Sequence, residues 1–264
     1  MVNARAAEVS PPDWTTDWTV GATGASTFRE DGGGQLKART QALTFSALRV
    51  WELSDSRWYV GAGPGADQVA VRSASPLLPA KLQDVYAQLA VERFEGKEAV
   101  AGVILNPGAY FGQTLRSGSW DMPIQAFSGV PLLAGLNGLV GIGNGRFYHH
   151  AVPAVGLIWE PSPDWRIEAT YPTPAVTYRP TKALALKLGA EITGGGFKTD
   201  LPGAPVVEYT SYRVGAVARY TAGDCFLELA GGVEAEGSFD FYHVNRRIHG
   251  SGAPYGRCSV EWGF

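Results

Sequence analysis

Hydrophobic and polar residues alternate along much of this chain. In the stretch 183–193, aliphatic residues at every even position alternate with Ala185, Lys187, Gly189, Glu191 and Thr193. In the stretch 165–171, charged or polar residues at every even position alternate with aromatic and aliphatic ones. A period of two places each set on one face of a β-strand. One face is therefore apolar, and the other combines full charges with small residues.

The same pattern predicts fourteen strands, with almost no helical periodicity. They cover residues 15–28, 37–52, 57–71, 82–93, 98–112, 122–134, 138–147, 149–160, 165–172, 174–180, 183–197, 207–220, 224–236 and 253–264. Most of these segments are longer than the roughly five or six residues typical of strands in globular proteins. About ten residues is the length that a tilted strand needs to cross a bilayer.

The connections between these strands alternate in length. Tight turns at 53–56, 94–98, 134–138, 161–164, 180–182 and 221–224 alternate with longer links at 29–35, 73–81, 113–121, 198–206 and 237–252. Short turns at one end and long loops at the other are typical of an outer-membrane β-barrel. The even count leaves both termini on the short-turn side, which is the periplasmic side in such barrels. Because the links 147–150 and 172–174 are brief, twelve strands is the second choice.

One domain accounts for residues 14–264 of this pattern. Residues 1–13 are expected to form a disordered leader or the remnant of a signal peptide, because Ala-Arg-Ala followed by Ala-Glu resembles the end of a cleavage site. We therefore predict an all-β, antiparallel, up-and-down transmembrane barrel.

Composition is compatible with this fold and excludes other classes. Mean hydropathy is -0.05 and no run of about 18 apolar residues exists, which excludes a transmembrane helix. A membrane barrel has middling hydropathy, because its lipid-facing and lumen-facing residues alternate. The net charge of -3 provides no basic surface, so nucleic acid is not an expected partner. The two cysteines, Cys225 and Cys258, are too few for a disulfide framework and are expected to be free and buried.

The final strand has an apolar face that ends at the last residue. Cys258, Val260, Trp262 and Phe264 share this face with Gly256. Such an ending resembles the C-terminal signal by which bacterial outer-membrane barrels are recognised for insertion. The alternative is an ordinary edge strand that ends at Phe by chance.

A resemblance covers the C-terminal two-fifths of the chain. Its elements are PAVGLIWEPSPDW, YPTPAVTYRP, LGAEITGGGF, YTSYRVGAVARY and FLELAGGVEAEGSFDFY, all within residues 153–264. In order and spacing they resemble an uncharacterised family of outer-membrane β-barrel proteins of Gram-negative bacteria, and residues 14–150 match it only loosely. The resemblance implies a barrel in the bacterial outer membrane, with outer-membrane lipid and the barrel-insertion machinery as partners. It implies no catalytic residues.

If Leu188 and Trp262 face lipid, strand parity places many charged residues inside the barrel. We predict a lumen charge network of Glu160, Arg166, Glu168, Arg179, Lys187, Glu191, Arg213, Arg219, Glu228, Glu234, Arg257 and Glu261, and the same parity also places Glu236 inside. Hairpin register makes Glu191 and Arg213 direct partners. Diagonal neighbours are expected to be Glu160 with Arg166, Glu168 with Arg179, and Glu234 with Arg257.

The width of the barrel decides whether this interior holds water. A barrel of about fourteen strands is too wide for side chains alone to fill, whereas ten or fewer strands would favour a packed interior. The fourteen-strand reading therefore favours a passive channel, or a structural barrel with a charged lumen, in which no chemical step occurs and no cofactor is needed.

Two other functions stay open. One is a subunit or anchor of a larger envelope assembly, with other envelope proteins as partners. The other is a lipid-modifying hydrolase that would use His150 with a serine and an acidic residue, although the spacing identifies no particular serine. The remaining histidines, His149, His243 and His249, fall at expected loop ends, so no metal site is predicted.

Overall fold

A computed structural model describes residues 14–24, 26–30, 35–53, 57–95, 98–147, 151–201, 203, 205–244 and 246–263. The expected leader at 1–13 and the terminal Phe264 lie outside these ranges. Within them, no helix combines the length and the apolar character that a membrane-crossing helix requires.

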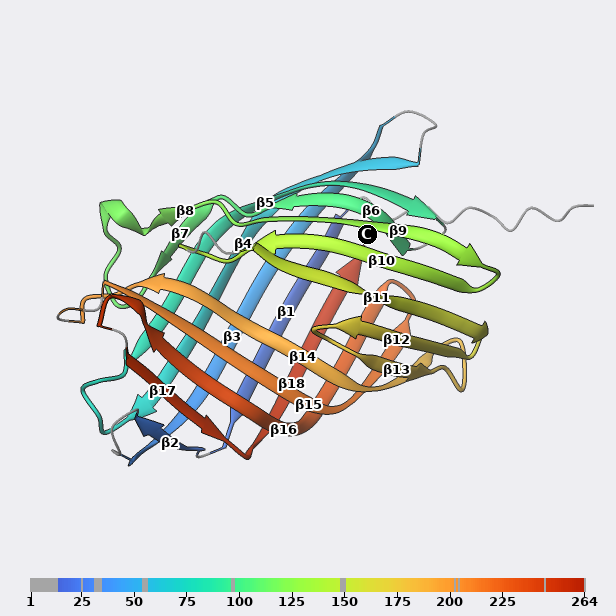
Figure 1. Cartoon of the computed structure of the whole chain (residues 1–264). Coiled ribbons are helices and arrows are strands. Elements are labelled where there is room, and N and C mark those ends of the chain that lie inside the picture. Colours follow the sequence, from blue (N-terminus) through green and yellow to red (C-terminus); the bar gives the residue numbers. More distant parts are fainter. Residues whose placement is uncertain are drawn as a thin grey trace, which may run out of the picture.

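Eighteen strands form one sheet that closes on itself (Figure 1). They are β1 (Trp14–Thr23), β2 (Ser26–Glu30), β3 (Gln35–Glu52), β4 (Trp58–Ser73), β5 (Lys81–Glu95), β6 (Glu98–Leu105), β7 (Gly108–Phe111), β8 (Trp120–Asp121), β9 (Ile124–Leu133), β10 (Leu136–Asn144), β11 (Ala151–Ser162), β12 (Trp165–Tyr171), β13 (Ala175–Tyr178), β14 (Leu184–Lys198), β15 (Val206–Ala222), β16 (Cys225–Phe241), β17 (Arg246–Ser251) and β18 (Ala253–Gly263). Two short 3-10 helices, η1 (Ser117–Ser119) and η2 (Tyr242–Val244), lie in the connections.

Four passes of the barrel wall are interrupted, which reconciles eighteen strands with fourteen passes. β1 continues as β2, β6 as β7, β8 as β9, and β17 as β18. The wall closes where β1 pairs with β18 in an antiparallel ladder that runs from Thr15 opposite Gly263 to Thr23 opposite Tyr255. The predicted fourteen-stranded antiparallel barrel is thereby confirmed.

The two ends of the barrel differ, as the connection lengths predicted. One end, which we call the turn end, carries the tight connections such as 134–135 and 223–224, and it also holds the start of β1 and the end of β18. The opposite end, the loop end, carries the connections 74–80, 112–119 and 199–205. That the turn end faces the periplasm stays a prediction.

The outer face of the barrel is apolar over its middle. Leu188 is 64% exposed and Trp262 57% exposed, whereas Arg213 on the other face is only 7% exposed. Further exposed apolar side chains around the wall are Val20, Leu89, Val140, Val155, Val214, Leu229 and Val260. We call this set the apolar belt.

Exposed aromatic residues follow the turn end of the belt. They are Trp51, Trp58, Trp159, Trp165, Tyr178, Tyr220 and Trp262, each within a few residues of a tight turn. Amphipathic rings in this position are typical of the interfacial girdle of a membrane barrel.

Two expectations about individual side chains were wrong. A bulge between β15 and β16 places Arg213 opposite Glu234 and Tyr212 opposite Glu236, so that Ala235 is an extra residue. The bulge reverses the face of the following residues, and the side chain of Glu236 is therefore 55% exposed instead of lying inside. Both cysteines are free, but Cys258 is exposed on the outer face and Cys225 only half-buried.

The wall is much taller on one side than on the other. β3, β4, β15 and β16 contain 16 to 18 residues each, whereas β12 has 7 and β13 only 4. At the loop end, β7 pairs with β5 and also reaches β14. There Phe111 lies beside Lys198, and the Gly112 N–H donates to the Lys198 carbonyl at 2.7 Å. Through this contact, β7 is followed directly by β14 at the loop end, and β8 to β13 do not take part in the wall there.

A smaller ring of nine described strands therefore closes the loop end, formed by β2, β3, β4, β5, β7, β14, β15, β16 and β17. An apolar core fills this ring. Its buried members include Phe28, Val71, Leu82, Tyr110, Phe197, Val207, Tyr209, Phe239, Phe241 and Ile248, which come from eight of the nine strands. A ring this narrow can be filled by side chains alone. The interior is thus packed at the loop end.

Replacing Leu188 by arginine tests the orientation of the apolar belt. Because Leu188 lies midway along the belt, the substitution should lower the free energy of unfolding in lipid vesicles by about 2–4 kcal/mol. Arginine at Leu53, an exposed residue at the turn end, should cost only about 0–1 kcal/mol. Equal losses for both variants, measured by denaturant titration, would contradict the assigned depth.

Candidate functional site

Inward-facing charges and two cavities make up the candidate site, which occupies the barrel interior between the turn end and the apolar core. The wider cavity, of about 720 Å³, lies at the turn end. Its charged lining consists of Arg166, Arg179, Lys182, Lys187 and Arg219 together with Asp164, Glu168 and Glu228. Five cations thus face three carboxylates in the lining of this mouth, and Glu160 is a further carboxylate that pairs with Arg166 and Arg179.

Ion pairs organise this mouth. Arg166 lies between two carboxylates, with Nη1 3.2 Å from Glu160 Oε1 and Nε 3.1 Å from Glu168 Oε1. Lys187 Nζ lies 3.5 Å from Glu168 Oε2, and Arg179 Nη1 lies 3.8 Å from Glu160 Oε1. Two glutamates are therefore shared by three cations, which fixes the positions of the side chains and retains one positive charge.

A second group of ion pairs lies deeper in the barrel. Arg213 Nη1 is 3.4 Å from Glu191 Oε1, and Arg213 Nε is 3.9 Å from Glu234 Oε2. Arg257 joins the same group, with Nη1 3.2 Å from Glu191 Oε2 and Nη2 2.5 Å from Glu228 Oε1. Glu234 is 1% exposed and also accepts a hydrogen bond from the Ser211 hydroxyl. Burial at this depth requires such pairing, because an unpaired charge would be very costly.

The structure brings together some of the predicted partners and separates others. Glu191 lies directly opposite Arg213, and Glu160 is paired with Arg166. The predicted pairs of Glu168 with Arg179 and of Glu234 with Arg257 are wrong. Their actual partners are those described above: Arg179 pairs with Glu160, and Arg257 with Glu191 and Glu228.

The remaining predicted residues, Arg219 and Glu261, form a pair of their own. Arg219 Nη2 lies 2.8 Å from Glu261 Oε2, and both side chains are more than one-third exposed. The Arg219 guanidinium also lies over the Phe226 ring, 4.4 Å from its centroid. This pair stands at the border between the two cavities, since Arg219 lines both of them.

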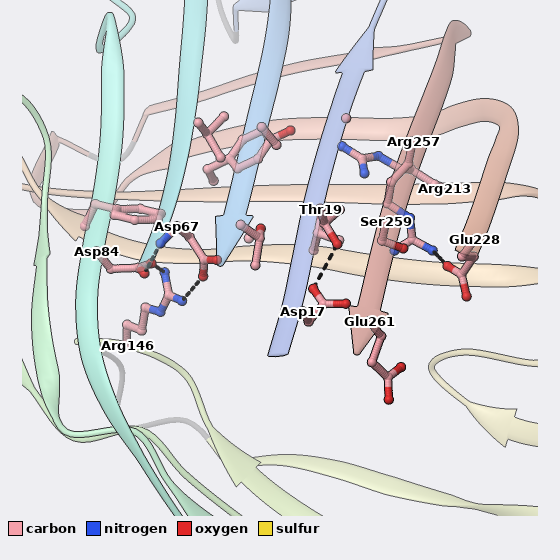
Figure 2. Close-up of a pocket in the computed structure, with 18 of the residues that line it drawn as sticks. Asp17, Thr19, Asp67, Asp84, Arg146, Arg213, Glu228, Arg257, Ser259 and Glu261 are labelled. Carbon is pink, nitrogen blue, oxygen red and sulfur yellow. Dashed lines mark hydrogen bonds and ion pairs between the residues drawn. The ribbon is translucent and has the colours of Figure 1, made fainter. Parts of the chain in front are cut away.

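The inner cavity, of about 370 Å³, lies between the deeper ion pairs and the apolar core (Figure 2). Its lining includes five carboxylates and four arginines: Asp17, Asp67, Asp84, Glu228, Glu261, Arg146, Arg213, Arg219 and Arg257. Arg219 and Glu228 line this cavity and the mouth alike, so the two spaces are adjacent. The charged interior therefore extends from the turn end to the underside of the core.

Sequence reasoning missed four charged residues of this cavity: Asp17, Asp67, Asp84 and Arg146. Parity was a usable signal for Asp84, because apolar Val85, Leu89 and Val91 stand at odd positions of the same segment and Asp84 at an even one. No comparable signal existed for Arg146, which lies in the connection after β10. Its side chain nevertheless reaches into the barrel, where Nη1 lies 2.6 Å from Asp84 Oδ2.

Comparison with known proteins supports the fold more than any detail of the site. No family model matches the chain, and no curated protein sequence matches it. A solved outer-membrane channel from Pseudomonas putida F1 superimposes with a TM-score of 0.55 at 15% identity, over 100% of both chains. A mutant of the monoaromatic hydrocarbon channel TodX superimposes with a TM-score of 0.54 at 11% identity, over 97% of this chain and 91% of that one.

The fold is that of an outer-membrane β-barrel. This agrees with the fold and the location that the sequence resemblance implied. The two structures described above are named as channels. At identities this low, the likeness extends to the fold alone.

The difference in burial between two arginines provides a test of the deeper ion pairs. Replacing Arg213 by methionine leaves Glu234 buried without its cation, and should lower the free energy of unfolding by about 3–5 kcal/mol. Methionine at Arg219, whose pair is solvent-exposed, should cost only about 0–1 kcal/mol. Denaturant unfolding of both refolded variants measures the difference. A loss at Arg213 no larger than at Arg219 would show that the deeper group does not hold the barrel together.

Proposed function

We propose that this protein is a passive outer-membrane channel with a charged lumen. The observation that carries the proposal is that two adjacent charged cavities share Arg219 and Glu228 in their linings. A solute entering at the turn end would meet charged side chains over the whole distance to the inner cavity. The channel structures with the same fold support this reading.

The lining favours polar or charged solutes. The TodX structure is named for a monoaromatic hydrocarbon channel, but the interior here is lined by arginines and carboxylates over both cavities. A bare hydrocarbon would gain little from such a surface, because charged groups remain best solvated by water or by one another. Small hydrophilic solutes or ions are therefore the proposed cargo.

The packed loop end defines where a route through the barrel must run. The nine-stranded ring is filled by its apolar core, so passage straight along the axis is blocked in this conformation. Beside the ring, one edge of β14 pairs with β13, but that edge has no strand partner from Glu191 to Phe197 in the described part of the chain. Arg146 stands at this break in the wall, next to Gly195. We infer that the route passes this point.

A second candidate function is a structural anchor in a larger envelope assembly. The apolar core that closes the loop end favours it, since a barrel without a transport role needs no through-route. No observation in the described part of the chain favours a hydrolase, and its candidate residue His150 lies outside that part. The proposed partners remain outer-membrane lipid and the barrel-insertion machinery, the latter acting through the last strand.

Single-channel recording in planar bilayers separates the channel from the anchor. The refolded protein should give discrete conductance steps, whereas a folded protein that gives none would support the anchor. Glu191→Gln should lower the ratio of K⁺ to Cl⁻ permeability and Arg213→Gln should raise it, each by about fourfold. The reason is that a unit charge ~10 Å from a permeating ion in water contributes about 0.4 kcal/mol, with opposite sign for K⁺ and for Cl⁻, so that the two effects add in the ratio. Glu236→Gln, on the outer face, is the control and should leave the ratio unchanged.

A further inference from the structure

Two carboxylates face each other on the side of the inner cavity that lies nearer the loop end. Asp67 on β4 lies directly opposite Asp84 on β5, and the Asp67 backbone N–H donates to Asp84 Oδ1 at 3.0 Å. Asp84 is 1% exposed. Like charges directly opposite each other on one face of a sheet repel, and burial increases that cost. A cation between the two carboxylates would offset both costs.

The Arg146 side chain supplies that cation from outside the two strands. Its Nη1 lies 2.6 Å from Asp84 Oδ2 and its Nη2 3.7 Å from Asp67 Oδ2 (Figure 2). The guanidinium also stacks on two rings, with Cζ 4.3 Å from the centroid of Tyr110 and 5.1 Å from that of Phe197. Two carboxylates and two aromatic rings thus surround one planar cation.

The surroundings leave space for the Arg146 side chain and place hydrogen-bond acceptors near it. A Cβ atom on Gly195 would lie 3.0 Å from Arg146 Cδ, so the absence of a side chain at Gly195 leaves room for the arginine. Asp67 Oδ1 is buried and has no hydrogen-bond partner among the described residues, so the site retains one unused acceptor. Asp67, Asp84 and Phe197 all line the inner cavity, which makes the site reachable from the lumen.

We propose that Asp67, Asp84, Tyr110 and Phe197 form a binding site for organic cations that carry a guanidinium group, and that Arg146 occupies it as a tethered ligand. Carboxylates match the planar donors of a guanidinium, and aromatic faces attract its charge. A primary ammonium lacks the planar fork and binds this arrangement less well. The site exists whether or not the barrel conducts, so the inference stands apart from the proposed channel function.

The tether determines what free cations can do in the intact protein. Because Arg146 is covalently attached beside the site, its guanidinium competes at an effective concentration of at least the order of millimolar. A free guanidinium compound therefore binds the wild-type site only when its concentration exceeds that value. Removal of the Arg146 side chain should expose the site to ligands at far lower concentration.

The experiment is calorimetric titration of ethylguanidinium chloride into the refolded, detergent-solubilised Arg146→Ala protein, at constant ionic strength. This variant should bind ethylguanidinium about tenfold or more tightly than the wild type does. Adding Asp84→Asn to Arg146→Ala should abolish the binding. Ethylammonium chloride should bind the Arg146→Ala protein more weakly than ethylguanidinium, and equal affinity would overturn the stated preference.

Arg247→Ala is the matched control. Arg247 also lies between two carboxylates, 2.9 Å from Glu236 and 3.3 Å from Asp240, but its side chain is 48% exposed and belongs to a different part of the wall. Equal affinity of the Arg146→Ala and Arg247→Ala proteins for ethylguanidinium would overturn the proposal, because any carboxylate pair would then suffice.

A folding defect would not leave the question undecided. If neither Arg146→Ala nor Arg146→Gln refolds in buffer, about 10 mM ethylguanidinium chloride should restore the yield of folded barrel, because the free cation replaces the missing guanidinium. The same concentration of sodium chloride should not. Failure of ethylguanidinium to improve refolding over sodium chloride would show that Arg146 merely braces the 145–147 connection.

Discussion

The structure depends on one constraint: the charged face of each strand cannot lie against hydrocarbon. A lysine or arginine at the bilayer midplane costs about 2–4 kcal/mol, and every unpaired backbone group adds to the cost. Pairing of β1 with β18 meets both demands together, because closure pairs the sheet edges and turns one face of every strand inward. The apolar belt and the ionic interior are two consequences of this closure.

The closed sheet meets a different packing problem at each end. Fourteen strands at the turn end enclose more space than side chains can fill, so charged residues there surround open cavities and neutralise one another in shared pairs. At the loop end, the contact of β7 with β14 reduces the ring to nine strands, and an apolar core fills it. Asp84 and Arg146 lie where one arrangement gives way to the other, which explains why a buried charge cluster adjoins an aromatic core.

Register explains which details of the site could be predicted. The β14–β15 hairpin pairs residues whose numbers sum to 404, as simple counting across the 198–206 loop requires, and Glu191 therefore meets Arg213. β16 and β18 pair with a register two residues from the expected one, so Arg257 lies near Glu228 instead of Glu234. A slip of two residues keeps every side chain on its face but changes its partners. Arg179 was also misplaced, because Glu168 lies opposite Ala175 and Arg179 lies beside Asp164 in the turn before β12.

The amino-acid sequence by itself determined the strand pattern, the strand number, the closed architecture and the face on which most charges lie. These follow from a period of two and from the cost of exposing charge to lipid, both of which are local properties. Only the tertiary structure decided that the loop end narrows and is packed, and that Arg146 enters the barrel to neutralise Asp67 and Asp84. Those features depend on two contacts, one between β7 and β14 and one between the 145–147 connection and β5. In each case the two segments are far apart along the chain, so a local sequence pattern cannot predict that they touch.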